Sequence, residues 1–156
     1  MTAAAAAAAL FGAACGGSTP STAAASPSPS PAASPAGTNA TIAVATSKLG
    51  QILVDGKGIT VYLFVADTGT SSTCNTACAT VWPPVLTTGA PQAGTGATAS
   101  LLGTTTRTDG TIEVTYAGHP LYYFVQDKSP GDTTGQGVNS FGALWWVLSP
   151  SGAAIH

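Results

Sequence analysis

The sequence predicts an all-β fold, in which two pseudo-symmetric antiparallel β-meander repeats pack together with at most one short helix. Short runs rich in Val, Ile, Thr and aromatic residues, each bounded by Gly, Asp or Pro, fill residues 41–156. These runs recur in the same order in the two halves of that region. Only one short stretch has helical character, and two consecutive prolines end it.

The internal repeat appears when residues 41–156 are compared with themselves at an offset of 60 positions. The aligned segments are GQILV at 50–54 with GTIEV at 110–114, and VYLFVAD at 61–67 with LYYFVQD at 121–127. Three extra residues in the second copy then bring Trp82 into line with Trp145. Two copies are too few for a solenoid or a propeller. We therefore expect the first repeat (41–95) and the second repeat (96–156) to form one domain.

Each repeat is expected to contain a three-stranded meander, followed by a fourth strand that carries a tryptophan. The strands of the first repeat are Thr41–Ser47, Gln51–Asp55, Thr60–Val65 and Trp82–Val85. Those of the second repeat are Ser100–Thr106, Thr111–Ala117, Leu121–Gln126 and Leu144–Ser149. The predicted helix is a short turn over Asn75–Val81, and Pro83 and Pro84 terminate it.

Charged side chains are scarce, and this excludes several classes of function. Asp, Glu, Lys and Arg make up 6% of the chain, against about 25% in an average soluble domain, and the net charge is −2. Four basic residues neutralise too few phosphates for nucleic-acid binding, so no nucleic-acid partner is expected. Six carboxylates and two histidines leave little for acid–base catalysis, and neither G-x-S-x-G nor H-E-x-x-H occurs. We predict no catalytic residue and no cofactor.

The N-terminal segment is typical of an export signal. Residues 3–14 are small and apolar, too short for a membrane span of about 20 residues but suited to the apolar core of a signal peptide. We therefore assign residues 1–14 to a signal peptide. The sequence GAAC ending at Cys15, followed by GGS, resembles a bacterial lipobox, in which the cysteine becomes the lipid-modified first residue. The alternative is an unmodified cysteine behind an alanine-rich run.

A tether is predicted between the lipid anchor and the folded domain, over residues 15–40. Its central part, residues 18–38, holds five of the eleven prolines and no charged or aromatic residue. Such a segment buries too little surface to offset its chain entropy, so we expect a disordered, semi-rigid spacer. A proline-rich ligand for a partner domain is the alternative. Anchor and tether together predict an exported protein, lipid-anchored at the cell membrane or outer envelope, with the membrane as its first partner.

Two segments match a six-residue pattern, Y-x-[FWY]-x-x-D, at 62–67 and 122–127. The residues that define the pattern are Tyr62, Phe64 and Asp67 in the first repeat and Tyr122, Phe124 and Asp127 in the second. The segment CNTACATVWPP at 74–84 adds a C-x-x-x-C-A-x-x-W-P-P motif. On these residues the chain resembles the bacterial secreted-repeat lipoproteins of unknown function. The resemblance implies export and a lipid anchor, but no reaction, and no residue supports the alkane catabolism sometimes attached to that family.

The spacing of the pattern predicts where its residues point. Positions two apart on a strand share a face, so Tyr62 and Phe64 should lie together in an aromatic core. Asp67 and Asp127 fall just beyond the strand ends, where a carboxylate accepts backbone N–H groups and fixes the next loop. The alternative is a paired site at the repeat interface for a cation or a polar ligand. A calcium site could recruit Asp132, Thr133 and Asn139, although their spacing matches no standard calcium loop.

The remaining candidates are cysteines, a tryptophan and a histidine. Cys74 and Cys78 are four apart in an exported chain, and one helical turn brings such residues within disulfide distance. A reactive dithiol, or a metal site that recruits His119, is the alternative. Trp145 should be core, so its neighbour Trp146 faces the other side of the strand. Trp146 and His119 are therefore candidates for a ligand surface.

Taken together, these features favour a non-enzymatic binding or structural module of the cell envelope. Its expected partner is a small molecule or an envelope protein of unknown identity. The alternative is a redox or metal-handling envelope protein that uses the Cys74 and Cys78 pair. No metal ion is expected in the first interpretation.

Overall fold

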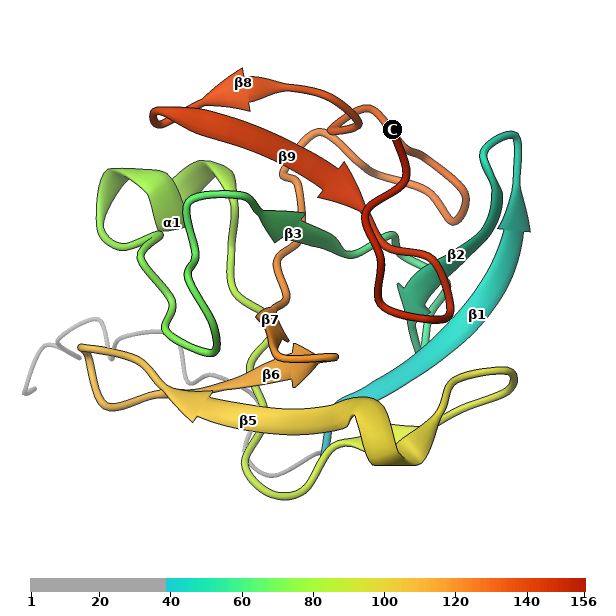
Figure 1. Cartoon of the computed structure of the whole chain (residues 1–156), viewed down its shortest axis with the longest axis horizontal. Helices are drawn as coiled ribbons and strands as arrows, with labels where there is room; N and C mark the ends of the chain where they lie inside the picture. Colours follow the sequence, from blue (N-terminus) through green and yellow to red (C-terminus); the bar gives the residue numbers. More distant parts are fainter. Residues whose placement is uncertain (1–38) are drawn as a thin grey trace, which may run out of the picture. The chain divides into compact units, whose positions relative to one another are not determined.

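The computed structural model describes residues 39–156. The predicted signal peptide (1–14), the lipidation site Cys15 and the tether up to residue 38 lie outside the described residues. Within the described part the strands are β1 (Thr41–Ser47), β2 (Gly50–Asp55), β3 (Tyr62–Phe64), β4 (Gln92–Ala93), β5 (Leu102–Thr106), β6 (Ile112–Tyr116), β7 (His119–Pro120), β8 (Asn139–Ser140) and β9 (Ala143–Val147) (Figure 1). The helices of that part are α1 (Ala77–Val81) and the 3₁₀ turn η1 (Ala99–Leu101). The predicted all-β class with one short α-helix is confirmed.

The first repeat begins with the antiparallel hairpin of β1 and β2, in register from Ile42 opposite Asp55 to Ser47 opposite Gly50. Gly50 closes the turn at a φ of 94°, a conformation that costs glycine little. Residues 52–54 of β2 are buried on both faces, which explains why they read as an uninterrupted apolar run. β4 pairs with β1 in parallel, and its two residues carry no pattern that would have predicted it.

The second repeat forms the antiparallel sheet β5-β6-β7, as its meander pattern predicts. The strand predicted over Ser100–Thr106 begins at Leu102, because the 3₁₀ turn η1 occupies the residues before it. β7 covers only His119 and Pro120 and replaces the predicted strand Leu121–Gln126. Beyond Leu121 the chain leaves this sheet.

The third predicted strand of each repeat, Thr60–Val65 or Leu121–Gln126, crosses over to pair with the other repeat. The simple meander prediction did not include this exchange. In the first repeat, residues 59–61 still bond to β2, but β3 then pairs with β9 of the second repeat. In the second repeat, residues 121–125 bond to residues 81–85 of the first. Figure 1 shows β3 beneath β9 in the middle of the molecule. The predicted meander pairing is therefore confirmed at the start of each third strand, in residues 59–61 and 119–121. It is wrong for the remaining residues, which pair with the tryptophan segment of the other repeat.

The exchange follows a pseudo-twofold axis that passes between Tyr62 and Tyr122. The backbone N–H of each tyrosine donates to the carbonyl of the other, at 2.8 and 3.0 Å. The predicted strand Trp82–Val85 is irregular and contains only isolated bridges, because Pro83 and Pro84 have no N–H to donate. Its counterpart, predicted over Leu144–Ser149, is the regular strand β9.

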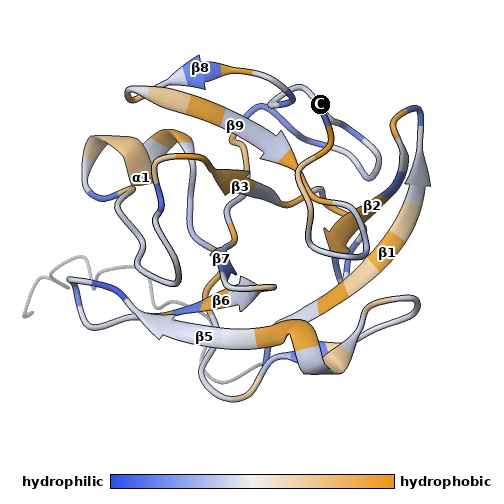
Figure 2. Cartoon of the chain, in the orientation of Figure 1, coloured by the Kyte–Doolittle hydropathy of each residue, from blue (hydrophilic) through white to orange (hydrophobic). Residues whose placement is uncertain are grey.

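The exchanged segments divide the interior into two clusters. One cluster is aromatic and gathers around Trp82 and Trp145, which are both fully buried. The other cluster is mainly aliphatic and includes Ile42, Leu53 and Leu148. Figure 2 shows the hydrophobic colour gathered on β2 and β3 and the hydrophilic colour on β8 and the outer loops. Neither helix in residues 39–156 has the length and apolar character that a membrane span requires.

Candidate functional site

The aromatic cluster contains a continuous stack of four rings that crosses the repeat interface. The rings follow the order Phe64, Trp145, Trp82 and Phe124. Successive centroids are 4.1, 4.0 and 4.2 Å apart, and the planes deviate from parallel by 12°, 3° and 23°. Each repeat contributes one phenylalanine from its six-residue pattern and one tryptophan, so the stack is symmetric about the pseudo-twofold axis.

The tyrosine of each repeat donates its hydroxyl proton to the aspartate of the other repeat. Tyr62 Oη donates to Asp127 Oδ2 at 2.5 Å, and Tyr122 Oη donates to Asp67 Oδ2 at 2.6 Å. All four side chains are buried, with 0% exposure for the tyrosines and 7–8% for the aspartates. We call these two pairs the tyrosine–aspartate clasp. The sequence predicted the tyrosines as core and did not predict that they would reach across the interface.

The second oxygen of each aspartate holds the loop that follows it. Asp67 Oδ1 accepts the backbone N–H and the hydroxyl of Thr73, at 2.8 and 2.6 Å. Asp127 Oδ1 accepts the same two groups of Thr134, at 2.9 and 2.5 Å. Both oxygens of both carboxylates therefore have donors from the protein itself. The clasp joins the two repeats and orders one long loop in each.

Burial raises the pKa of both clasp tyrosines. Desolvation is the largest influence and raises the pKa of both hydroxyls above the ordinary value for tyrosine. The carboxylate of Asp127 raises the pKa of Tyr62 further. The pKa of Tyr122 is raised further by the charge of Glu113 and by its hydrogen bond to Asp67. Each tyrosine hydroxyl therefore stays protonated into the alkaline range and donates a hydrogen bond to its aspartate.

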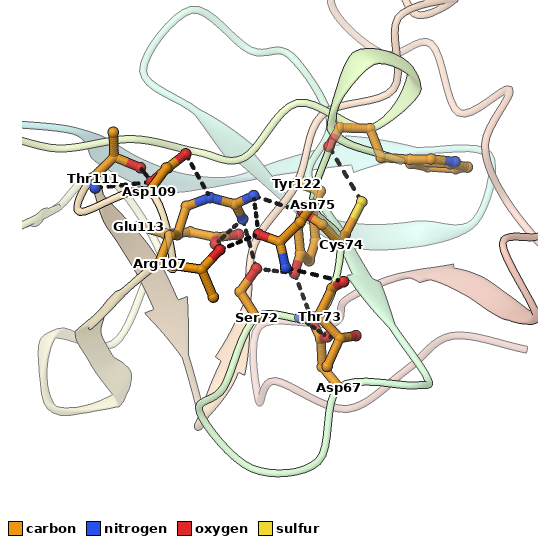
Figure 3. Close-up of polar contacts among 12 residues, drawn as sticks. Asp67, Ser72, Thr73, Cys74, Asn75, Arg107, Asp109, Thr111, Glu113 and Tyr122 are labelled. Atoms are coloured by element: carbon orange, nitrogen blue, oxygen red, sulfur yellow. Dashed lines mark hydrogen bonds and ion pairs between the residues drawn. The ribbon is translucent and has the colours of Figure 1, made fainter. Parts of the chain in front are cut away.

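A buried ion pair supports the first-repeat loop, and the sequence interpretation missed it. Arg107 Nη1 lies 2.7 Å from Glu113 Oε2, with 4% and 0% exposure for the two residues. Arg107 also donates to Ser72 Oγ at 2.6 Å and to the carbonyl of Cys74 at 2.6 Å (Figure 3). Ser72 Oγ lies 2.7 Å from Tyr122 Oη, so the ion pair connects to the clasp. The chain contains only ten charged residues, so each of them deserved consideration as a structural or functional residue. This scarcity is the signal that could have identified Arg107 and Glu113.

Charge burial perturbs the acid of this pair. Desolvation raises the pKa of Glu113 to about 7, and it outweighs the opposing influence of the Arg107 guanidinium. Glu113 Oε1 and Arg107 Nε have no hydrogen-bond partner, although both atoms are buried. Within residues 39–156 no counterpart of this ion pair borders the second clasp, where Gly135 N–H donates to Tyr62 Oη at 3.3 Å.

The disulfide prediction is confirmed, since Cys74 and Cys78 are bonded with a Cα–Cα distance of 5.1 Å. The bridge joins Cys78, the second residue of α1, to the loop before the helix, because α1 begins at Ala77 rather than at the predicted Asn75. Both cysteines are buried, with 1% exposure for Cys74 and 7% for Cys78. The bridge fixes the loop whose Cys74 carbonyl accepts from Arg107.

The other sequence candidates lie apart from the clasp. His119 lies in β7 opposite Tyr116, whereas Trp146 lies in β9 opposite Leu63. Trp146 is half-buried and meets His156 edge-on at a centroid distance of 4.7 Å. Asp132 Oδ2 accepts the backbone N–H groups of Lys128 and Ser129. Among residues 39–156, no three His, Cys, Asp or Glu side chains group closely enough to hold a metal ion.

Replacing either clasp aspartate with asparagine should cost about 1–2 kcal/mol, because the amide oxygen still accepts from the loop threonine while the buried tyrosine hydroxyl loses its acceptor. Replacement of Asp67 or Asp127 with alanine should cost about 1–3 kcal/mol, because buried donors lose their acceptor. Urea denaturation followed by circular dichroism measures both losses. EDTA should leave the melting temperature of the wild type unchanged. A melting temperature that falls with EDTA, recovers with Ca²⁺ and becomes insensitive in Asp67→Asn would instead identify a cation site.

A family model described as a secreted repeat of unknown function matches the chain twice, at residues 43–86 and 103–149. The two matches coincide with the two repeats and include all six pattern residues. No curated protein and no solved structure matches the chain.

Proposed function

Because this chain belongs to the Lipoprotein_15 family of secreted repeats, we propose that it is an exported protein anchored to the cell envelope by lipid on Cys15. Its two-repeat domain acts as a non-enzymatic binding or structural module. The partner is an envelope protein or a small molecule, and the tether holds the domain away from the membrane surface. The function of the family itself is unknown.

The observation that carries this proposal is that the pattern residues satisfy one another. Every oxygen of Asp67 and Asp127 accepts hydrogen bonds from this chain, so neither carboxylate is left for a substrate. The tyrosine hydroxyls are donors to those carboxylates, and the aromatic rings fill the core. Because the pattern residues join the two repeats into one packed unit, the outer surface of the domain is held rigidly. A rigid surface is suited to binding a partner.

A surface suited to a partner lies where the hairpin of β8 and β9 turns. Phe141 is 48% exposed at this turn and adopts a φ of 55°, which is costly for a bulky residue. Val65, 52% exposed, is hydrogen-bonded through its N–H to the carbonyl of Leu144 in β9. Phe141 and Val65 are therefore the exposed apolar side chains that we assign to contact with a partner. Trp146 and His119 remain candidates for a separate ligand surface.

The redox and metal alternative has less support. The sulfurs of Cys74 and Cys78 are bonded to each other, and both residues are nearly inaccessible to a reagent. A zinc site needs further ligands, and none groups with this pair among the described residues.

Replacing Cys15 with serine should abolish lipid labelling and release the protein from the membrane fraction. The reason is the loss of acyl chains, whose burial contributes about 0.8 kcal/mol per CH₂ group. Metabolic labelling with radioactive palmitate and fractionation of cells that express the full chain behind a functional export signal measure both effects.

The matched control is Cys74→Ser/Cys78→Ser, which removes the other two cysteines and should keep both the label and the membrane association. Membrane retention of Cys15→Ser equal to that of the wild type would refute the anchor. Export without any labelling of the wild type would refute it as well.

A further inference from the structure

The four rings of the stack lie close together and nearly parallel. Aromatic pairs in proteins prefer offset or edge-to-face arrangements with centroids about 4.5–7 Å apart. The centroids of Trp82 and Trp145 are 4.0 Å apart with planes only 3° from parallel, and a phenylalanine continues the stack on each side. Close parallel overlap is the arrangement that couples neighbouring π systems electronically. It therefore suits the movement of charge between rings.

Each end of the tryptophan pair has a tyrosine with its own proton acceptor. Tyr62 meets Trp82 edge-on at 5.4 Å, and Tyr122 meets Trp145 edge-on at 5.2 Å. Each hydroxyl donates to a buried aspartate, so a phenolic proton can move within an existing hydrogen bond. Oxidation of a tyrosine by one electron requires the loss of that proton. In each pair of the clasp, the aspartate carboxylate is the base that can accept this proton.

We propose that the stack and the clasp together form a one-electron relay, in which Trp82 and Trp145 are oxidised first and Tyr62 and Tyr122 reduce them. A one-electron oxidant of high potential, such as a peroxyl radical, removes an electron from the tryptophan pair and becomes a hydroperoxide with a proton from water. The tryptophan radical cation then takes an electron from a tyrosine. The phenolic proton passes to the carboxylate, which leaves a neutral tyrosyl radical and a carboxylic acid.

The relay is reset by an electron from a donor such as a quinol, which releases a proton to water. The carboxylic acid returns its proton to the tyrosyl oxygen, so the clasp is restored. The indole N–H groups stay protonated during the cycle, because they donate to Ser140 Oγ and to the Ser140 carbonyl, which are not bases. Burial of the rings excludes a bound ligand but does not prevent an electron from crossing a thin layer of protein.

Photo-oxidation of the purified full chain tests the relay. Ruthenium tris-bipyridine, oxidised by a flash in the presence of an electron-accepting quencher, is the probe. Transient absorption and electron paramagnetic resonance should show a tryptophan radical cation that converts into a tyrosyl radical. In D₂O this conversion should slow, because the proton moves together with the electron, and that measurement requires no variant.

The decisive variant is Asp67→Asn/Asp127→Asn, which is expected to fold and contains no base at either clasp. It should lose the tyrosyl radical and retain the tryptophan signal. Tyr62→Phe/Tyr122→Phe should give the same result. The matched controls are Tyr116→Phe, which removes a buried tyrosine that donates to the Pro150 carbonyl, and Trp146→Phe. Both controls should retain the conversion.

Three results would overturn the relay. The first is a tyrosyl radical of undiminished yield in the asparagine double variant. The second is a conversion that Tyr116→Phe or Trp146→Phe abolishes. The third is a conversion rate that is equal in H₂O and D₂O. The relay does not depend on the lipid anchor or on the proposed binding role, so these outcomes leave the proposed function untouched.

Discussion

Replacement of Trp145 with alanine should lower the free energy of unfolding by about 3–5 kcal/mol. Trp145 is fully buried and stacks on Phe64 and Trp82, with centroids 4.1 and 4.0 Å away. Its removal leaves a large cavity at the interface of the two repeats. The surrounding strands cannot move in to fill this cavity without breaking the pairing of β3 with β9. Urea denaturation followed by far-ultraviolet circular dichroism measures this loss.

The neighbouring tryptophan supplies the control. Trp146 is half-buried on the opposite face of β9, so Trp146→Ala should cost distinctly less than Trp145→Ala. Trp82→Ala should resemble Trp145→Ala, and the double variant should lose less than the sum, because the two rings contact each other. Equal losses at positions 145 and 146 would contradict the assignment of the stack as the centre of the fold.

Replacement of Arg107 with methionine should cost about 3–5 kcal/mol at pH 8, because it leaves the buried carboxylate of Glu113 without its partner. The loss should be smaller at pH 5. There, Glu113 becomes neutral by taking up a proton, which is the less costly alternative for an unpaired buried acid. Thermal denaturation at the two pH values measures the difference. Lys48→Met, which removes an exposed basic residue, should stay within about 0.5 kcal/mol at both.

The sign of the pH dependence follows from the raised pKa of Glu113. The folded protein holds this proton up to a pKa of about 7, whereas the reference value is 4.5. The folded state therefore binds more protons in this interval, so the contribution to stability is complete below pH 4.5 and is lost as the pH rises through about 7. Glu113→Gln should abolish the pH dependence of the free energy of unfolding that comes from this carboxyl group. At pH 8 the double variant Arg107→Met/Glu113→Gln should be more stable than Arg107→Met alone. A loss in Arg107→Met that is the same at pH 5 and pH 8 would exclude this origin.

Local patterns were sufficient for most elements. β1 and β2 were predicted from β-branched runs around a glycine turn, and α1 from a short segment before two prolines. The two-residue strand β4 could not be predicted, because Gln92 and Ala93 have no β pattern and pair only because β1 is beside them. The 3₁₀ turn η1 likewise follows from the path of the chain rather than from its composition.

The sequence predicted the residues of the candidate site but not the hydrogen bonds that join them across the two repeats. Tyr62 and Phe64 were correctly assigned to the core from their spacing. The partner of each tyrosine could not be predicted, because Asp127 lies 65 residues away from Tyr62 and in the other repeat. Arg107 and Glu113 have no motif, and only their burial distinguishes them from surface charges.

The sequence by itself determined the strand runs, the repeat and the family, because these depend on the order and type of neighbouring residues. Only the tertiary structure decided that β3 pairs with β9 and that each Tyr donates to the aspartate of the opposite repeat. The physical reason is that the two repeats have similar strand patterns, so the local sequence does not specify which repeat supplies the partner of a strand. The choice between the two is made by burial, since exchange across the interface places both tryptophans in one stack and satisfies both buried carboxylates at the same time.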